Sequence, residues 1–212
     1  MNESECPILK ERKEMIAKAD EMIKDLASRK EKVIELLNSD LMSEDAKWEN
    51  IKASPLDQTG GNIAINKMMK SSEPALEQFS NDIVNIKTKI ILILSNLNES
   101  EEDDMSMLSE EQEGSSSPSN KFMMIIQGIQ SMSEWSSSVL DGWIGYHMTR
   151  MQLLQAGSAN AVDLLSIKMA KEMKSMLNDL LFYYLMLEDI VLDATGAVME
   201  TPKTPGYCGL YV

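Results

Sequence analysis

The spacing of apolar residues predicts two long helices on either side of an acidic stretch. From residue 76 onward, apolar side chains recur at alternating intervals of three and four residues, and the same rhythm returns after residue 121. This pattern is typical of helices that pack along their whole length. The positions that follow it are Leu76, Phe79, Ile83, Ile86, Ile90, Ile93 and Leu97, and then Phe122, Ile125, Ile129, Met132, Val139, Trp143 and Tyr146. Ser136 is the one polar residue in the second series.

A further helix is predicted before these two. Apolar pairs recur at seven-residue steps from Ile8-Leu9 onward, while lysines and glutamates occupy the other positions, as in an amphipathic helix. Arg29 and Lys30 interrupt the apolar stripe at the place where the next pair should fall. We expect these two side chains to face solvent or to contact another subunit.

The last helix is predicted after a break at Gly157-Ser158. A near-heptad of apolar residues runs from Leu164 to Val198, and Pro202 follows it. Four long helices with short or polar connections favour an antiparallel bundle.

We therefore predict an all-α protein, an up-down-up-down four-helix bundle in a single domain. The expected helices are 7–38, 72–98, 121–155 and 160–200. Ser72 is expected to cap the second helix, with Pro74 in its first turn. Between the helices we expect a mobile linker at 39–71 and an acidic loop at 99–120, and after them a C-terminal tail at 201–212.

Charge narrows the classes of partner. The formal net charge is −14, and eight acidic residues with no Lys or Arg lie between Glu99 and Glu113. Nucleic acid is not an expected partner, because phosphate binding requires clustered basic side chains. A helix that lies on a membrane surface would need a basic polar face, which this charge balance does not provide. The longest apolar runs are also far shorter than the roughly 18 residues that span a bilayer.

The residues that carry chemistry are sparse. His147 is the only histidine, and the chain has no Glu-x-x-His pair, no glycine-rich phosphate loop and no Cys-x-x-Cys. The neighbouring carboxylates Glu188 and Asp189 are interpreted as a solvated helix face rather than an acid/base pair. We predict that the protein is not an enzyme and that it binds no metal and no cofactor.

The cysteines and the first residues indicate the compartment. The chain has two cysteines, Cys6 and Cys208, far apart in the sequence and without metal-ligand spacing. The first five residues, Met1–Glu5, lack the basic and apolar character of a secretion signal. We expect reduced thiols in a cytoplasmic or nuclear protein.

Four stretches, taken together, resemble the eleven-S (REG-type) proteasome activators. They are Ile83–Leu92, then Asn120-Lys121-Phe122 with Gln127, then Tyr146 with Arg150, and finally Leu185–Val191 followed by Pro202-Lys203. The order and spacing of these stretches carry the resemblance, which covers most of the chain from about Leu76 onward. The sequence departs from the family in its acidic stretch, which resembles an insertion, and at Met123, where the family has glycine.

The resemblance implies a ring, heptameric in the family, that caps the alpha ring of the proteasome core particle without ATP. It implies that loop residues Ser119, Asn120 and Phe122 act on the gate of the core. It also implies that the C-terminal tail docks on the core. The last three residues, Leu210, Tyr211 and Val212, are similar to the hydrophobic-Tyr-any ending of the proteasomal ATPase rings. In an antiparallel bundle, the 99–120 loop and the end of the last helix lie at the same end.

A second interpretation stays open. A helical bundle of this kind could equally be a coiled-coil adaptor or trafficking protein that binds partner helices. The two interpretations differ in mass, because the first implies a ring and the second a monomer or a dimer.

Overall fold

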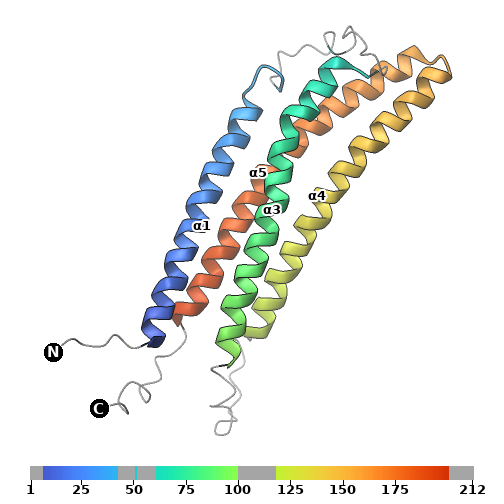
Figure 1. Cartoon of the computed structure of the whole chain (residues 1–212). Coiled ribbons are helices and arrows are strands. Elements are labelled where there is room, and N and C mark those ends of the chain that lie inside the picture. The colour runs from blue at the N-terminus through green and yellow to red at the C-terminus, as the bar shows by residue number, and fades with distance from the viewer. Residues whose placement is uncertain (1–6, 43–50, 52–60, 100–117, 201–212) are drawn as a thin grey trace, which may run out of the picture.

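The structure is a computed structural model that describes residues 7–42, 51, 61–99 and 118–200. These residues form four long helices, which are α1 (Pro7–Leu37), α3 (Ile63–Glu99), α4 (Pro118–Gln155) and α5 (Ala159–Glu200). The helices run alternately up and down, as Figure 1 shows. The predicted all-α four-helix bundle is confirmed.

The predicted start of the second helix was wrong. Helix α3 begins at Ile63 rather than at Ser72, so the last part of the expected 39–71 linker is helical. Asn62 is the true N-cap, because its side-chain oxygen accepts a hydrogen bond of 3.2 Å from the backbone N–H of Ile65. The Asn62 amide group also donates a bond of 2.8 Å to the carbonyl oxygen of Ile51, which ties the preceding segment to the cap.

Pro74 lies in the interior of α3 and not in its first turn. A proline there removes one backbone donor and clashes with the carbonyl group one turn earlier. Its ring is exposed, so the proline sits on the face of α3 where solvent can satisfy the freed carbonyl group. Tertiary packing of the rest of this long helix overrides the local preference against an internal proline.

Helix α5 is the central element, because its contacts with α1, α3 and α4 are the three most extensive helix contacts among the described residues. Its buried side chains form a stripe along the helix, which includes Met169, Met173, Leu177, Leu180, Tyr184, Leu187 and Val191. The predicted pattern for α5 is confirmed over this region and was wrong at Leu164, which is 66% exposed. Near Leu164 the buried positions are Val162 and Ser166 instead, which lie seven residues before Met169 and Met173 and continue the same stripe.

An aromatic cluster joins three of the helices. Phe79 of α3 is fully buried and meets Tyr184 of α5 edge-on, with ring centroids 5.1 Å apart. Trp135 of α4 approaches Phe79 in the same edge-on manner at 5.8 Å, and Tyr183 stacks obliquely on Trp135 at 4.7 Å. These separations are typical of favourable aromatic pairs.

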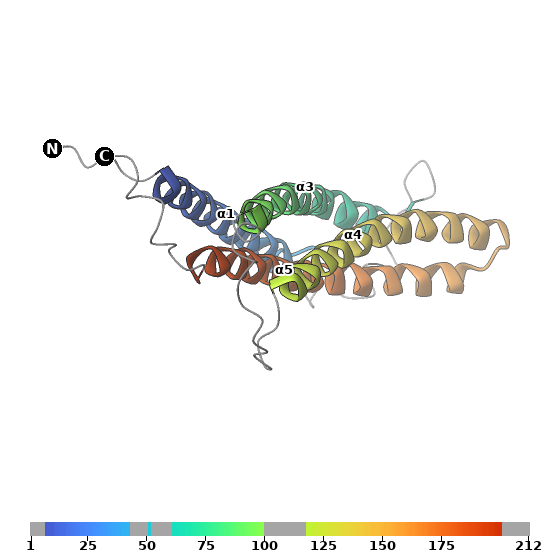
Figure 2. The same cartoon turned by 90° about the horizontal axis from the view of Figure 1, so that it is seen from below.

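The turn between α4 and α5 is compact. Gly157 has a φ of 70°, and its N–H bonds to the Leu154 carbonyl while the Ser158 N–H bonds to the Leu153 carbonyl. This is the Schellman arrangement that ends a helix, and it favours glycine because of the positive φ. Figure 2 shows that this α4–α5 hairpin extends beyond the ends of α1 and α3.

We expect Phe79→Ala to lower the free energy of unfolding by about 3 to 5 kcal/mol, because it opens a cavity where three helices meet. The control is Val84→Ala on the same helix, since Val84 is 63% exposed. The control should change stability by less than about 0.5 kcal/mol. Urea unfolding at one fixed protein concentration measures both. Equal effects of the two substitutions would contradict the packing described here.

Candidate functional site

One end of the bundle gathers the helix ends that flank the predicted functional segments. The C-terminal end of α3, the N-terminal end of α4 and the C-terminal end of α5 lie together at this end in Figure 1. We expected the 99–120 connection and the end of the last helix to share one end of the bundle. The helices that flank these segments do end there together. We call this the loop end of the bundle.

The predicted loop residues lie in helix α4. This helix begins at Pro118, a residue well suited to a first helical position, so Ser119, Asn120 and Phe122 belong to its first two turns. The predicted boundary of the loop at residue 120 was therefore too late. The positions of these three residues at the loop end follow from the backbone of α4 alone.

The predicted tail residues Leu210, Tyr211 and Val212 lie outside the described residues, as does the acidic segment 100–117. The structure therefore does not bring the predicted loop and tail side chains together in one described site. It does place the helix ends from which both segments continue.

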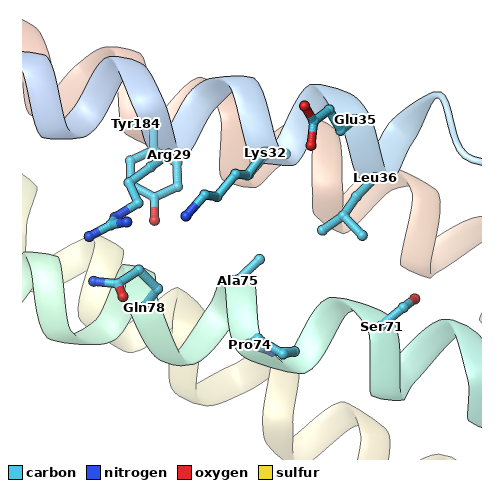
Figure 3. A pocket seen from close by; sticks show the side chains of 10 residues that line it. Arg29, Lys32, Glu35, Leu36, Ser71, Pro74, Ala75, Gln78 and Tyr184 are labelled. Atoms are coloured by element: carbon cyan, nitrogen blue, oxygen red, sulfur yellow. The ribbon is translucent and has the colours of Figure 1, made fainter.

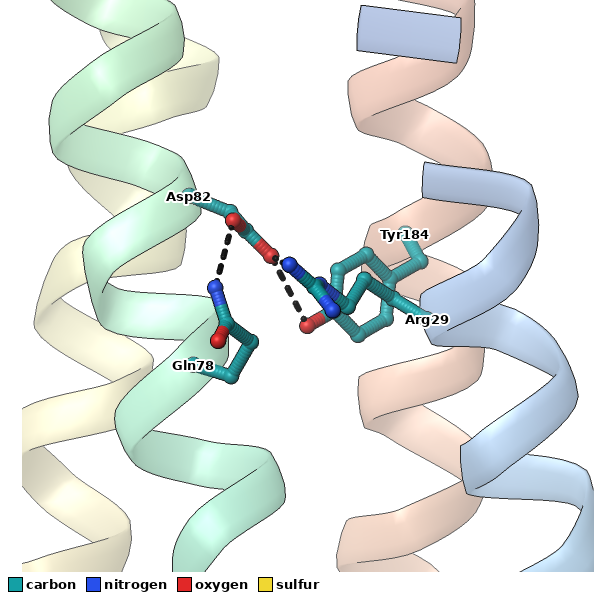
Figure 4. Close-up of polar contacts among 4 residues, drawn as sticks. All are labelled: Arg29, Gln78, Asp82 and Tyr184. Carbon is teal, nitrogen blue, oxygen red and sulfur yellow. Dashed lines mark hydrogen bonds and ion pairs between the residues drawn. The ribbon is translucent and has the colours of Figure 1, made fainter. Parts of the chain in front are cut away.

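A polar cluster links α1, α3 and α5 near the middle of the bundle (Figure 4). Asp82 of α3 accepts hydrogen bonds from the Tyr184 hydroxyl at 3.3 Å and from the Gln78 amide at 2.9 Å. The Arg29 Nε atom of α1 lies 3.6 Å from the same carboxylate. A partly buried carboxylate beside a cation and two hydrogen-bond donors is compensated, so this cluster has a structural explanation.

A second polar contact joins α1 to α5, between the Lys30 ammonium group and the Glu188 carboxylate. The expectation that Arg29 and Lys30 face solvent or another subunit was wrong, because both pair with carboxylates of their own chain. Glu188 was also misjudged as solvated, since its side chain is only 22% exposed. Arg29 and Lys30 fill positions in the helix contact where apolar side chains were expected.

Tyr146 and Arg150, which carry part of the family resemblance, are both buried. The Tyr146 hydroxyl lies 3.3 Å from the Ser166 hydroxyl across the α4–α5 hairpin. Burial raises the pKa of Tyr146, and the Ser166 hydrogen bond and the Arg150 charge offset part of this rise. The pair therefore helps to hold the hairpin together and does not form an open site.

The outward side of α4 is unusually apolar. Leu140, Ile144, Met148 and Met151, spaced four, four and three residues apart, are 42%, 59%, 61% and 49% exposed. Between Ser137 and Gln155 the only exposed charged residue is Asp141. We call these four residues the α4 outer face. A contiguous apolar strip on a chain with 25% charged residues marks an interaction surface.

In 7–42, 51, 61–99 and 118–200, no group of three or more histidine, cysteine, aspartate or glutamate residues is arranged to hold a metal ion. No helix within the same residues is long and apolar enough to cross a membrane.

The four-helix fold matches that of a solved protein structure. The structure is similar to the crystal structure of the 11S subunit of the Plasmodium falciparum proteasome, PA28, with a TM-score of 0.60 and 17% sequence identity. The similarity covers 94% of this chain and 97% of that chain, so it extends over the whole bundle. No protein-family model and no curated protein sequence matches the chain. The resemblance to the eleven-S activators that the sequence indicates is thus confirmed at the level of the fold.

The sequence interpretation missed two features that bear on function. The α4 outer face could have been found from the near absence of charge between residues 136 and 155, in a chain otherwise rich in charge. The polar cluster could have been found from Arg29 and Lys30, because charges at seam positions of a helix need partners on the facing helix.

We expect the stability of the protein to fall as the pH rises above about 10, the ordinary pKa of an unfolded tyrosine. Burial, and then the adjacent Asp82 carboxylate, raise the pKa of Tyr184 in the folded state, while Arg29 opposes the rise only in part. The unfolded chain then loses a proton that the folded chain retains, so the contribution of Tyr184 is fully present below pH 10 and declines above it.

Tyr184→Phe should make this alkaline decline shallower, leaving the smaller part that Tyr146 contributes. Tyr183→Phe is the matched control, because it removes a hydroxyl group from the same aromatic cluster and leaves Tyr184 in place. Urea unfolding between pH 7 and pH 11 measures the decline. If the two variants show the same pH profile as the parent, the burial of the Tyr184 phenol is not its cause.

Proposed function

We propose that this chain is a subunit of an ATP-independent proteasome activator. In this proposal a ring of identical chains, heptameric as in the eleven-S family, caps the alpha ring of the proteasome core particle in the cytoplasm or the nucleus. The C-terminal tail docks on the core and the connection between α3 and α4 opens the substrate gate. The observation that carries the proposal is the fold similarity to the 11S subunit over nearly the full length of both chains.

The geometry of the loop end supports this arrangement. A cap must present its docking and gate-opening segments to the core on one surface. The helix ends that lead into the acidic segment and into the tail lie together at the loop end. Seven copies of a weak tail contact, held in one ring, bind far more tightly than one copy, because the later contacts form at a high effective concentration.

Self-association has candidate surfaces on two helices. A head-to-tail ring needs two different patches on each subunit. The α4 outer face is one of them. The second is an exposed apolar set on α5, made of Phe182, Leu185 and Leu192, which are 58%, 46% and 51% exposed. Chains that each carry a net charge of −14 repel one another, which favours contacts on surfaces with little charge. The α4 outer face fits this better than the α5 set, because Asp189 is exposed between Leu185 and Leu192.

The predicted non-enzymatic role agrees with this proposal, since such an activator changes access to the proteolytic sites of the core and does no chemistry itself. Gate opening by contact also needs no nucleotide, in keeping with the lack of a glycine-rich phosphate loop in the sequence. The coiled-coil adaptor interpretation remains the alternative, and the exposed apolar strips are the surfaces on which it would bind a partner helix.

We expect the full chain to stimulate hydrolysis of short fluorogenic peptides by a closed proteasome core, and removal of Leu210–Val212 to abolish the stimulation because the tail no longer docks. Asn120→Ala should still bind the core in a sedimentation assay but should fail to open the gate. Absence of stimulation with a core from a matched species would contradict the proposal. An Asn120→Ala variant that opens the gate as well as the parent would remove this residue from the gate-opening role.

We expect the parent protein to form a ring, measured as mass by light scattering or native mass spectrometry. Ile144→Asp should shift the mass to smaller species, because it places a charge in the middle of the α4 outer face. Val84→Asp is the matched control, since Val84 is 63% exposed against 59% for Ile144, and it should leave the mass unchanged. A parent mass of a monomer or dimer would favour the adaptor interpretation.

A further inference from the structure

A groove lies between α1 and α3, on the side of the bundle where these helices separate (Figure 3). Its volume is about 470 Å³, within the range of pockets that hold small molecules. The space exists because Pro74 and Ala75, two short side chains of α3, line it opposite Leu36 of α1. Val33 of α1 lines it as well. The groove is remote in sequence from the residues that the proposed activator function uses, and it does not depend on that function.

The floor of the groove is apolar and one of its walls is cationic. Val33, Leu36 and Ala75 provide the apolar surface. Arg29 and Lys32 reach from α1 toward α3, and their nitrogen atoms border the open space in Figure 3. A pocket that combines an apolar floor with a few placed polar groups selects a ligand of matching shape and charge.

The two cations differ in what neutralises them. Arg29 pairs with Asp82 at 3.6 Å. Lys32 makes no ion pair with any carboxylate among the described residues. Among the described residues that line the groove Glu35 is the acidic one, and in Figure 3 its carboxylate stays beside the α1 ribbon instead of crossing toward α3. Lys32 is therefore the cation of the groove wall that has no carboxylate partner in the described part of the chain.

We infer that the groove binds a small amphipathic carboxylate, a molecule with one carboxylate group and a short apolar chain. The carboxylate pairs with the Lys32 ammonium group, and the chain lies on Val33, Leu36 and Ala75. A ligand with several charges does not suit the apolar floor, and a cationic ligand gains no ion pair with Lys32. An uncharged apolar ligand forgoes the ion pair with the exposed Lys32 ammonium group and binds less tightly.

Decanoate, labelled with carbon-13 at its carboxyl group and kept below its micelle-forming concentration, is a suitable probe for the full chain. We expect saturable binding at one site, detected by NMR as a shift of the carboxyl signal and by calorimetry as a stoichiometry of one per chain. Lys32→Gln should weaken binding about twofold to fivefold, the effect of losing an exposed ion pair. Lys32→Glu should weaken it further, and Ala75→Leu should block it by filling the groove.

The matched control is Lys24→Gln, which makes the same change of charge on an exposed lysine of α1 outside the groove. It should bind decanoate as the parent does, and decanol should bind the parent several-fold less tightly than decanoate. Circular dichroism establishes whether each variant is folded. If Ala75→Leu does not fold, the two Lys32 variants test the inference without it. The inference is overturned by an absence of saturable binding, by equal losses in Lys24→Gln and Lys32→Gln, or by equal affinity for decanol. It is also overturned if Lys32→Glu changes the mass of the assembly while decanoate fails to bind the parent, since the groove is then a contact for another protein chain.

Discussion

The burial of α5 against three other helices is the constraint on which the rest of the structure depends. Leu180 and Leu187 are fully buried, because α1, α3 and α4 together cover the helix on several sides. Since α1 and α3 both pack on α5, they need not pack closely on each other, and the groove between them follows. Since α4 covers one side of α5 and reaches beyond α3, its own outward side is left without a cover. The groove and the uncovered α4 outer face are thus consequences of the central position of α5.

Polar contacts specify how these helices are aligned. An apolar seam with a seven-residue repeat retains much of its burial when one helix slides by two turns, because the repeat presents a similar surface. The Ser80 and Ser136 hydroxyls, 2.7 Å apart, meet in one alignment of α3 and α4 only. The bond between Asp82 and Tyr184 does the same for α3 and α5. Ser136, the one interruption in the apolar series of α4, is therefore a register contact.

The sequence predicted the helices that are long, periodic and capped by familiar signals, and it failed where a local signal competed with tertiary packing. The last helix was predicted well, because Gly157 is a strong stop signal and Leu177, Leu180 and Leu187 follow a regular repeat. The start of α3 was predicted late, because Pro74 suggests a first turn while the packing of the preceding turn on the core keeps the helix going. The partly buried ion pairs of Arg29 and Lys30 could not be assigned, since their partners lie far away in the sequence. For the functional site, antiparallel order predicts that the α3–α4 connection and the end of α5 lie at the same end of the bundle. The α4 outer face and the groove could not be predicted, because they depend on which helix faces are left uncovered.

The contact between Lys30 and Glu188 joins residues that are 158 positions apart, and it has a consequence for how the chain is synthesised. At a translation rate of about 5 to 20 residues per second, the ribosome adds Glu188 roughly 10 to 30 s after Lys30. During that interval α1 has no access to α5, the helix on which it chiefly packs, and its apolar stripe remains exposed. The neighbouring α3, α4 and α5 meet through connections that are closer in the sequence, so they can assemble first. The first helix to leave the ribosome is then the last to be packed, which makes α1 the segment of the nascent chain most in need of protection by a chaperone.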